Sequence, residues 1–243
     1  MLEPRTLHPV APGQAPHRPE TRLDRSRHAA PQIVEHLRRR IVALDLPPGV
    51  LLSRADLATG FGVSQTPVRD ALMRLEEEGL VLVFPQHKTI VTRVDIGHAR
   101  HAHFLRRALE LEVVRTLAAA GDGKLVRRLR ATIVHQRTAL AARDYPGFTM
   151  YDQAFHQQMF EAADVPGLWE EVRRRSGHLD RLRRLHLPAE GKGDAILRDH
   201  ARIVGAIAKQ DPDAAQERVR EHLSGTLLQV DAIRERYPDY VIN

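Results

Sequence analysis

The 243-residue chain contains no cysteine, which excludes disulfides, thiolate zinc sites and thiol catalysis. It has no apolar run close to the roughly 18 residues that cross a membrane. The first twenty residues lack the apolar core of a signal peptide. We therefore expect a soluble, cytoplasmic protein with no membrane partner.

Acidic residues are outnumbered by basic ones, with a formal net charge of +6 and a sequence pI of about 10.1. This excess suits a polyanionic partner such as nucleic acid. Residues 1–93 hold 13 Lys and Arg against 10 Asp and Glu, and the remainder holds 24 against 21. Each part is therefore net +3, and composition alone does not locate a DNA-binding region.

The chain divides into segments of different character. Residues 1–28 are rich in Pro, His and Arg with little apolar periodicity, which predicts a disordered arm. We expect a winged helix-turn-helix DNA-binding domain over 29–94 and a linker over 95–97. A helical effector, metal-binding and dimerisation domain should follow over 98–235, with a C-terminal tail over 236–243.

The stretch from Ser53 to Leu80 has the layout of a helix-turn-helix. Ser53 and Asp56 form a capping box at the start of a short helix, and Gly60 and Gly62 end that helix. Ser64 is expected to cap the next helix, whose Val68, Leu72 and Leu75 face inward while Gln65, Thr66 and Arg69 point outward. In such proteins the N-terminal end of this second helix enters the DNA major groove.

Two β-rich runs, LVLVF and TIVTRV, flank the turn PQHK and predict a hairpin that acts as a wing. Residues 31–94 then resemble the winged-helix domain of the GntR family of bacterial transcription regulators. The motifs that carry this resemblance are LPPG at 46–49, SRADL at 53–57, GVSQTPVRDAL at 62–72, and EGL at 78–80.

The resemblance implies DNA binding, but this chain departs from the family in places. Gln65 stands where the family often has Arg, and its amide pairs better with adenine than with guanine. His87 and Lys88 occupy the wing tip, where glycine is usual. The operator sequence therefore does not carry over from the family. The expected DNA-binding residues are Arg54, Ser64, Gln65, Thr66, Arg69, His87 and Lys88.

From His98 onward every segment has helical periodicity, and there is no strand signal, glycine-rich phosphate loop or dinucleotide fingerprint. The fold class is therefore mainly α, with an N-terminal winged helix-turn-helix and a C-terminal all-α bundle of about six helices. These helices are expected near 98–120, 123–143, 146–163, 165–186, 194–209 and 212–235.

Four residues of the helical part could bind a divalent metal ion. Asp152 and His156 are four positions apart and share one helix face, while His200 and His222 lie on two later helices. Imidazole suits zinc, nickel and related ions. Spacing alone is weak evidence, because an Asp/His pair of this kind is more often a surface pair.

Residues 98–235 resemble the all-helical effector domain of the FadR subgroup, called the FCD domain. Its metal-binding members carry Asp-x-x-x-His, then His, then His on these helices, and the chain fills all four positions. The resemblance implies a divalent ion, zinc first with nickel or manganese as alternatives, that helps to hold a small organic or sugar acid. Val165 departs from the family, which often has Asn before this proline.

The effector also needs cationic or hydrogen-bonding groups. Arg106 matches the Arg of the subgroup's Arg-x-x-Leu-Glu pattern, and His178 and Arg181 could share a face toward the ligand. Arg183 and Arg184 are assigned to a solvated basic face. The expected effector-binding residues are therefore Arg106, His178 and Arg181.

These observations indicate a ligand-responsive DNA-binding regulator, with repression the expected mode and no catalytic residues. It should bind a near-palindromic operator as a homodimer. Two alternatives remain at this point. One is a metalloenzyme in which a metal-bound water hydrolyses a substrate, although no further carboxylate at motif spacing offers a general base. The other is a regulator that senses the metal itself.

Overall fold

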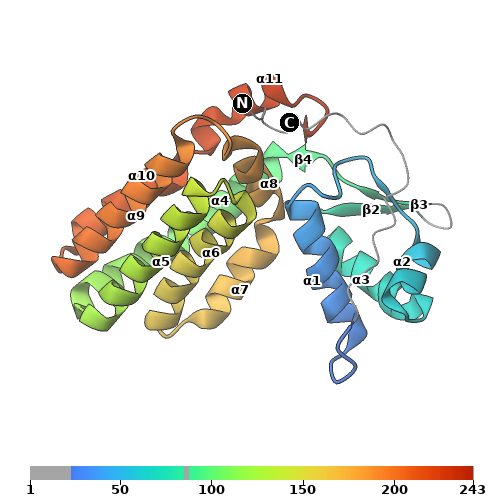
Figure 1. Cartoon of the computed structure of the whole chain (residues 1–243), viewed down its shortest axis with the longest axis horizontal. Helices are drawn as coiled ribbons and strands as arrows, with labels where there is room; N and C mark the ends of the chain where they lie inside the picture. Colours follow the sequence, from blue (N-terminus) through green and yellow to red (C-terminus); the bar gives the residue numbers. More distant parts are fainter. Residues whose placement is uncertain (1–22, 85–87, 243) are drawn as a thin grey trace. The chain divides into compact units, whose positions relative to one another are not determined.

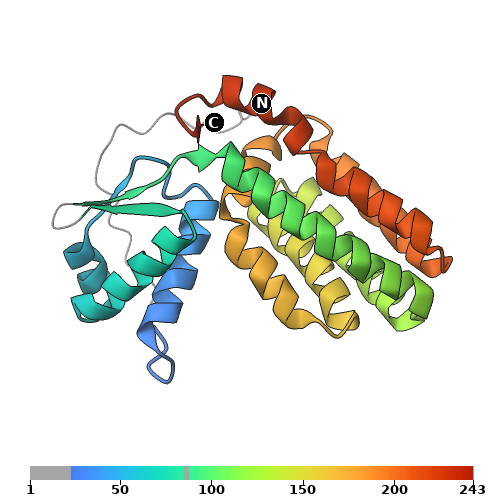
Figure 2. The same ribbon diagram turned by 180° about the vertical axis from the view of Figure 1, so that it is seen from behind.

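The computed structural model describes residues 23–84 and 88–242. The chain forms two compact units, which divide after Asp95 and again after Ile233, so that the last residues return to the N-terminal unit. Figure 1 shows the elements of both units, and Figure 2 shows them from behind. No helix in the described part of the chain is long and apolar enough to span a membrane.

The N-terminal unit contains three helices and a three-stranded antiparallel sheet in the order β1-β3-β2. Val83 of β2 pairs with Thr89 of β3, and Leu51 of β1 pairs with Ile90. The elements are α1 (Ala29–Val42), β1 (Leu51–Leu52), α2 (Arg54–Phe61), α3 (Gln65–Glu77), β2 (Val81–Phe84) and β3 (Lys88–Val91).

Helix α1 packs against α3 through an apolar stripe. Its Ile33, Leu37 and Ile41 recur every fourth residue and are fully buried, as helical periodicity requires. Arg38 pairs with Glu78 just beyond α3 at 2.7 Å, and both side chains are mostly buried. Helices α1 and α3 therefore share one core.

The turn between α2 and α3 forms as the sequence predicts. The Ser53 hydroxyl accepts a hydrogen bond from the Asp56 amide at 3.2 Å, which caps α2. Gly62 ends α2 with a φ of +67°, a backbone conformation that glycine adopts without steric cost. Ser64 occupies the N-cap position of α3, but its side chain makes no cap hydrogen bond within the described residues. Ser64 therefore has the expected N-cap position but does not make the expected cap hydrogen bond.

The predicted wing is present as β2 and β3. The turn expected between them, including His87, falls on residues 85–87 and lies outside the described residues. The two-residue strand β1 joins the wing as a third strand, which the sequence did not indicate because two residues give no detectable alternation.

Two expected boundaries differ in the structure. The linker expected at 95–97 is instead the end of strand β4 (Val94–Asp95) followed directly by helix α4 (Ile96–Ala120). The C-terminal tail expected over 236–243 carries strand β5 (Val241–Ile242), which pairs with β4 in parallel. The Val94 amide donates to the Tyr240 carbonyl at 2.7 Å. The C-terminal segment is therefore partly buried: Tyr240 and Val241 are 7% and 4% exposed.

The helical unit confirms the all-α expectation, although two of the six expected helices are each divided. A break at Ser176 separates α7 from α8, and another at residues 225–229 separates α10 from α11. At the first break the Ser176 hydroxyl donates to the Val172 carbonyl at 2.6 Å, a local bond that competes with helix continuation. The helices after α4 are α5 (Gly123–Ala141), α6 (Tyr145–Ala162), α7 (Pro166–Arg175), α8 (Gly177–His186), α9 (Lys192–Ala208), α10 (Pro212–Ser224), the short 3-10 turn Leu227–Gln229, and α11 (Val230–Arg236).

The helical unit brings distant segments together around a single core. Helix α10 packs against both α4 and α9, and α5 packs against both α6 and α9 (Figures 1 and 2). Phe148, Phe155 and Phe160 of α6 are fully buried in this core. The inward faces of α4, α6, α9 and α10 thereby converge.

Replacing Gly62 with alanine should destabilise the N-terminal unit by about 1 kcal/mol, because a Cβ is disfavoured in the left-handed region. Hydrogen–deuterium exchange of peptides from α2 and α3 would measure the loss locally. Gly205→Ala is the control, because a Cβ there meets no atom within 4 Å inside a regular helix. Equal protection of α2 and α3 in wild type and Gly62→Ala would contradict the proposed role of this turn.

Candidate metal centre

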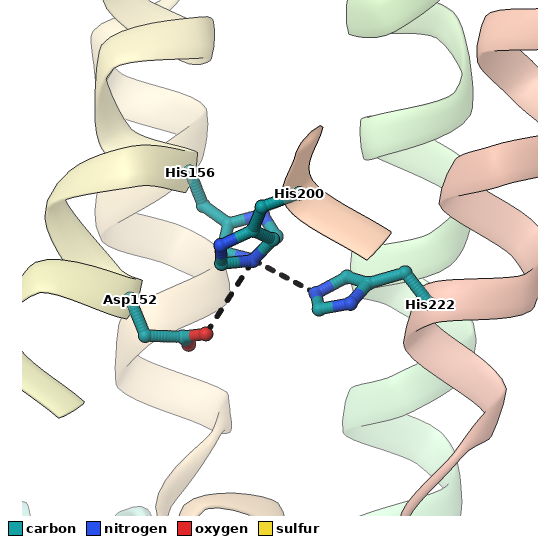
Figure 3. Close-up of side chains that lie close together, drawn as sticks. All are labelled: Asp152, His156, His200 and His222. Carbon is teal, nitrogen blue, oxygen red and sulfur yellow. Dashed lines mark hydrogen bonds and ion pairs between the residues drawn. The ribbon is translucent and has the colours of Figure 1, made fainter. Parts of the chain in front are cut away.

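Three helices bring Asp152, His156, His200 and His222 together in the core of the helical unit. Asp152 and His156 lie one turn apart on α6, His200 lies on α9 and His222 on α10. All four are buried, and each offers a ligand atom within 4.8 Å of the other three. Figure 3 shows the three rings and the carboxylate turned toward a common point. The structure thus unites all four residues that the sequence selected.

Two of the three imidazoles have a hydrogen-bond acceptor at Nδ1, whereas Nδ1 of His222 makes no hydrogen bond within the described residues. Nδ1 of His156 lies 2.8 Å from the Glu110 carboxylate, and Nδ1 of His200 lies 2.9 Å from the Gln136 side-chain oxygen. Nδ1 of His222 faces the Asp199 carboxylate at 3.7 Å. An Nδ1–H that donates to such a group leaves the Nε2 lone pair free to bind a metal. The surroundings therefore favour the tautomer that a metal ligand needs.

The Nε2 atoms meet where an ion would sit. Nε2 of His222 lies 3.3 Å from Nε2 of His156, and Nε2 of His200 lies 3.6 Å from the Asp152 carboxylate. Nε2 of His200 is buried and has no hydrogen-bond partner within the described residues. Ligand atoms about 2.1 Å from a divalent ion lie about 3–4 Å apart. The three imidazoles and one carboxylate therefore fit a divalent cation.

The ionisation states also suit a cation. Burial lowers the pKa of His156 to about 4, although the adjacent Glu110 carboxylate opposes this effect. Burial likewise lowers the pKa of His200. Burial by itself would raise the pKa of Asp152, but Arg183 and the neighbouring imidazoles hold it well below its usual value. Neutral imidazoles and a charged carboxylate are the forms that bind metal.

Arg183 holds Asp152 in place, which corrects its assignment to a solvated basic face. Its Nη2 atom lies 2.6 Å from one carboxylate oxygen of Asp152, and its side chain is 22% exposed. The other carboxylate oxygen faces His200 and the Gln136 amide. The break between α7 and α8 was absent from the sequence prediction, so the inward direction of Arg183 could not be predicted from helix periodicity.

A buried ion pair links Arg106 to the centre. Nε of Arg106 lies 2.5 Å from Glu110, whose other oxygen accepts from His156. Burial would raise the pKa of Glu110, but Arg106 and His156 lower it below its usual value. Sequence reasoning selected Arg106 and missed Glu110. The signal was available, because Glu110 is one helical turn from Arg106 on the same face.

A small cavity of about 20 Å³ lies beside the cluster. Helices α4, α8, α9 and α10 contribute its lining, which includes the metal-cluster residue His222. His178 and Arg181 share a buried face of α8 and lie 3.1 Å apart, as the sequence suggested, but they do not belong to this lining. The polar lining residues are instead His103, Arg106, Arg183, Lys192, His222 and Thr226.

The predicted DNA-contacting residues that the structure describes, all but His87, lie on the surface of the N-terminal unit. Gln65 and Thr66 begin α3 and are exposed, and the Arg69 side chain is 63% exposed one turn later. Arg54 at the start of α2 and Lys88 at the start of β3 are also exposed. The three α3 side chains therefore lie at the helix end that enters the groove in helix-turn-helix proteins.

Two family models match the chain and together cover most of it. Residues 29–91 match the model described as bacterial regulatory proteins, gntR family. Residues 101–225 match the FCD domain model. These matches coincide with the winged-helix unit and with the helices that carry Asp152, His156, His200 and His222.

Similar proteins are transcription regulators. An uncharacterized HTH-type transcriptional regulator in an unstable DNA locus of Streptomyces ambofaciens is 37% identical, over 84% of this chain and 85% of its own length. The HTH-type transcriptional repressor RspR of Escherichia coli K12 is 30% identical, over 91% of this chain and 97% of its own. The solved structure of E. coli McbR/YncC is similar in fold, with a TM-score of 0.71 at 19% identity, over 86% of this chain and 98% of that one.

Replacing Glu110 with glutamine should cost about 3–5 kcal/mol of stability, because Arg106 would be left buried without its carboxylate. Chemical denaturation in the presence of a chelator would measure this cost without a contribution from bound metal. Glu112→Gln is the matched control on the same helix, because its pair with Arg115 is exposed and should contribute little. Equal stability of the two variants would contradict a buried Arg106–Glu110 pair.

Proposed function

Because the chain belongs to the GntR family of bacterial regulatory proteins and carries an FCD domain, it is a DNA-binding transcription regulator and not an enzyme, and we propose that a small acid bound at a metal ion in the helical unit controls its affinity for DNA. The observation that carries this proposal is the convergence of three imidazole Nε2 atoms and one carboxylate in a buried site. The adjoining cavity supplies cationic groups that could hold an acid.

The DNA-reading part of the proposal rests on α3. Gln65, Thr66 and Arg69 would enter the major groove, with Gln65 positioned to read adenine. Arg54, Ser64 and Lys88 would contact phosphates, and the amides at the start of α3, which have no side-chain cap, would bind a further phosphate. A homodimer would place two such helices on the half-sites of a near-palindromic operator.

The metal part of the proposal rests on Asp152, His156, His200 and His222. Zinc suits this ligand set best, and nickel or manganese are the alternatives. A bound divalent ion would supply positive charge that attracts the carboxylate of the effector. Arg183 already holds Asp152, and Arg106 holds Glu110, so both guanidinium groups are fixed at the edge of the cavity.

Control of DNA binding requires the acid to bind one arrangement of the dimer more tightly than another, since only differential affinity shifts the population. We propose that the acid-bound form releases DNA, which makes the protein a repressor. Direct sensing of the metal is the second candidate. It is favoured by the presence of four protein ligands, which are enough to close a tetrahedral site.

Replacing Arg69 with alanine should weaken binding to a DNA duplex selected from a random library by roughly tenfold to a hundredfold, as loss of a base-reading arginine does. Fluorescence anisotropy would measure the affinity. Arg74→Ala is the control, because Arg74 is exposed in the last turn of the same helix. Comparable losses in the two variants would argue against the N-terminal end of α3 as the reading surface.

Replacing His200 with alanine should abolish stoichiometric metal binding and the response of DNA binding to acids, while His135→Ala on an exposed face of α5 should change neither. The added metal should raise the melting temperature of the wild type and of His135→Ala but not that of His200→Ala, since it stabilises only a protein whose native state binds it. Mass spectrometry of metal content, thermal melting and anisotropy would provide the readouts. Full metal content in His200→Ala would remove His200 from the site. A change in DNA affinity on metal addition alone would favour direct metal sensing.

A further inference from the structure

The cavity beside the metal centre is lined by three cationic side chains and no acidic ones. Arg106 comes from α4, Arg183 from α8 and Lys192 from the first position of α9. Two of these cations already have carboxylate partners in Glu110 and Asp152. The charge that remains available in the cavity is therefore positive.

Several polar atoms of this lining are unused. Nη2 of Arg106 and Nε2 of His103 are buried and make no hydrogen bond within the described residues, and Arg106 is only 2% exposed. Across residues 23–84 and 88–242, no hydrogen bond or ion pair involves the ammonium group of Lys192, although Asp199 and Asp152 attract it from a greater distance. A buried donor without a partner costs free energy, so a ligand that accepts from it is favoured.

The Lys192 ammonium lies close to Gly225. A Cβ at Gly225 would lie 2.9 Å from Nζ of Lys192, closer than side-chain atoms normally approach. The absence of a side chain there, at the end of α10, lets the ammonium lie against the backbone beside the cavity. His222 is three residues earlier, so the ammonium and the metal cluster share this end of α10.

The carboxylates around the cavity are already matched by cations. Arg106 pairs with Glu110 at 2.5 Å, Arg183 with Asp152 at 2.6 Å and Arg173 with Asp180 at 2.5 Å. Asp199 lies 3.6 Å from Arg202. A divalent ion would add two positive charges and Lys192 adds one, with no further carboxylate in the lining. An effector with a single negative charge would leave most of this buried charge uncompensated, which is costly.

We propose that the effector is a short dicarboxylate, with one carboxylate at the metal centre beside Arg183 and the second bound by Lys192, His103 and the free Nη2 of Arg106. This rests on the proposed function, because it assumes an acid at a bound metal. The cavity of about 20 Å³ is about the size of one water molecule, so a bound diacid has to displace lining side chains, which disfavours a long chain between the two carboxylates. Guanidinium and ammonium groups both form strong charge-assisted hydrogen bonds with carboxylates.

Binding of matched acids to the zinc-loaded full-length protein tests this inference. Malonate, succinate and glutarate would be compared with acetate, propionate and butyrate by titration calorimetry. Fluorescence of Trp169, the single tryptophan of the chain, gives a second readout, because its ring lies 6.3 Å from the His156 ring. At least one diacid should bind roughly tenfold or more tightly than any of the monoacids. Equal affinities, or tighter binding of inorganic phosphate than of any diacid, would overturn the dicarboxylate proposal.

The variant Lys192→Gln should remove most of the preference for the diacid while leaving monoacid binding unchanged. Lys192→Arg should retain the preference, and Lys209→Gln, at an exposed position after the same helix, is the control. An equal loss of monoacid and diacid binding in Lys192→Gln, with metal content intact, would contradict a second carboxylate site. The wild-type comparison decides the question even if a variant does not fold.

The outcomes separate this inference from the proposed function. Metal-dependent binding of monoacids and diacids with equal affinity would leave the proposed function standing and refute only the second carboxylate site. If no acid binds the zinc-loaded protein, both proposals fail.

Discussion

The hydrogen bonds at the Nδ1 atoms of the buried histidines are the constraint on which the candidate site depends. Glu110 and Gln136 hold His156 and His200 at 2.8 and 2.9 Å, and each ring can then direct only Nε2 toward the centre. Without these acceptors, a ring could turn over or bury an unpaired N–H, which costs free energy. The orientation of these two rings is thus set by Glu110 and Gln136, which would not themselves touch the proposed ion.

These hydrogen bonds connect several helices of the helical unit. Glu110 lies on α4 and Gln136 on α5, while the rings that they hold lie on α6 and α9. These four helices, and α10 with His222, must therefore pack together before the site exists. Phe155 contributes directly, because its ring stacks on His200 with centroids 4.0 Å apart. The apolar core and the polar cluster are consequently one structure, and a ligand that alters the cluster acts on the packing of several helices.

The chain on either side of the helical unit is also constrained. Helix α4 begins directly after β4, and α11 is followed within a few residues by β5, which pairs with β4. The two chain ends of the helical unit therefore lead into the same small parallel sheet. A free linker and a free tail would permit independent motion of these ends, whereas paired strands couple them through backbone hydrogen bonds.

The sequence predicted the winged helix well because its signals are local: the Ser53 cap, the Gly62 turn and the alternation of the wing all act over a few residues. Asp152, His156, His200 and His222 were identified through the family resemblance, since their spacing alone was ambiguous. The partners Glu110, Gln136 and Arg183 depend on how helices pack, which periodicity does not specify. The break at Ser176 precedes Arg183 within one expected helix, and the β4–β5 pair joins residues nearly 150 positions apart, so neither the Arg183–Asp152 pair nor the small sheet could be predicted from local pattern.

The central claim is that three imidazoles and one carboxylate hold a metal ion that is open to an acid. X-ray absorption at the zinc edge of the zinc-loaded protein tests this claim most directly. The claim predicts three nitrogen ligands with imidazole scattering and oxygen ligands at about 2.0–2.2 Å, with a change in the oxygen shell when succinate is added. A spectrum with fewer than two imidazole ligands, or one that succinate leaves unchanged, would contradict it.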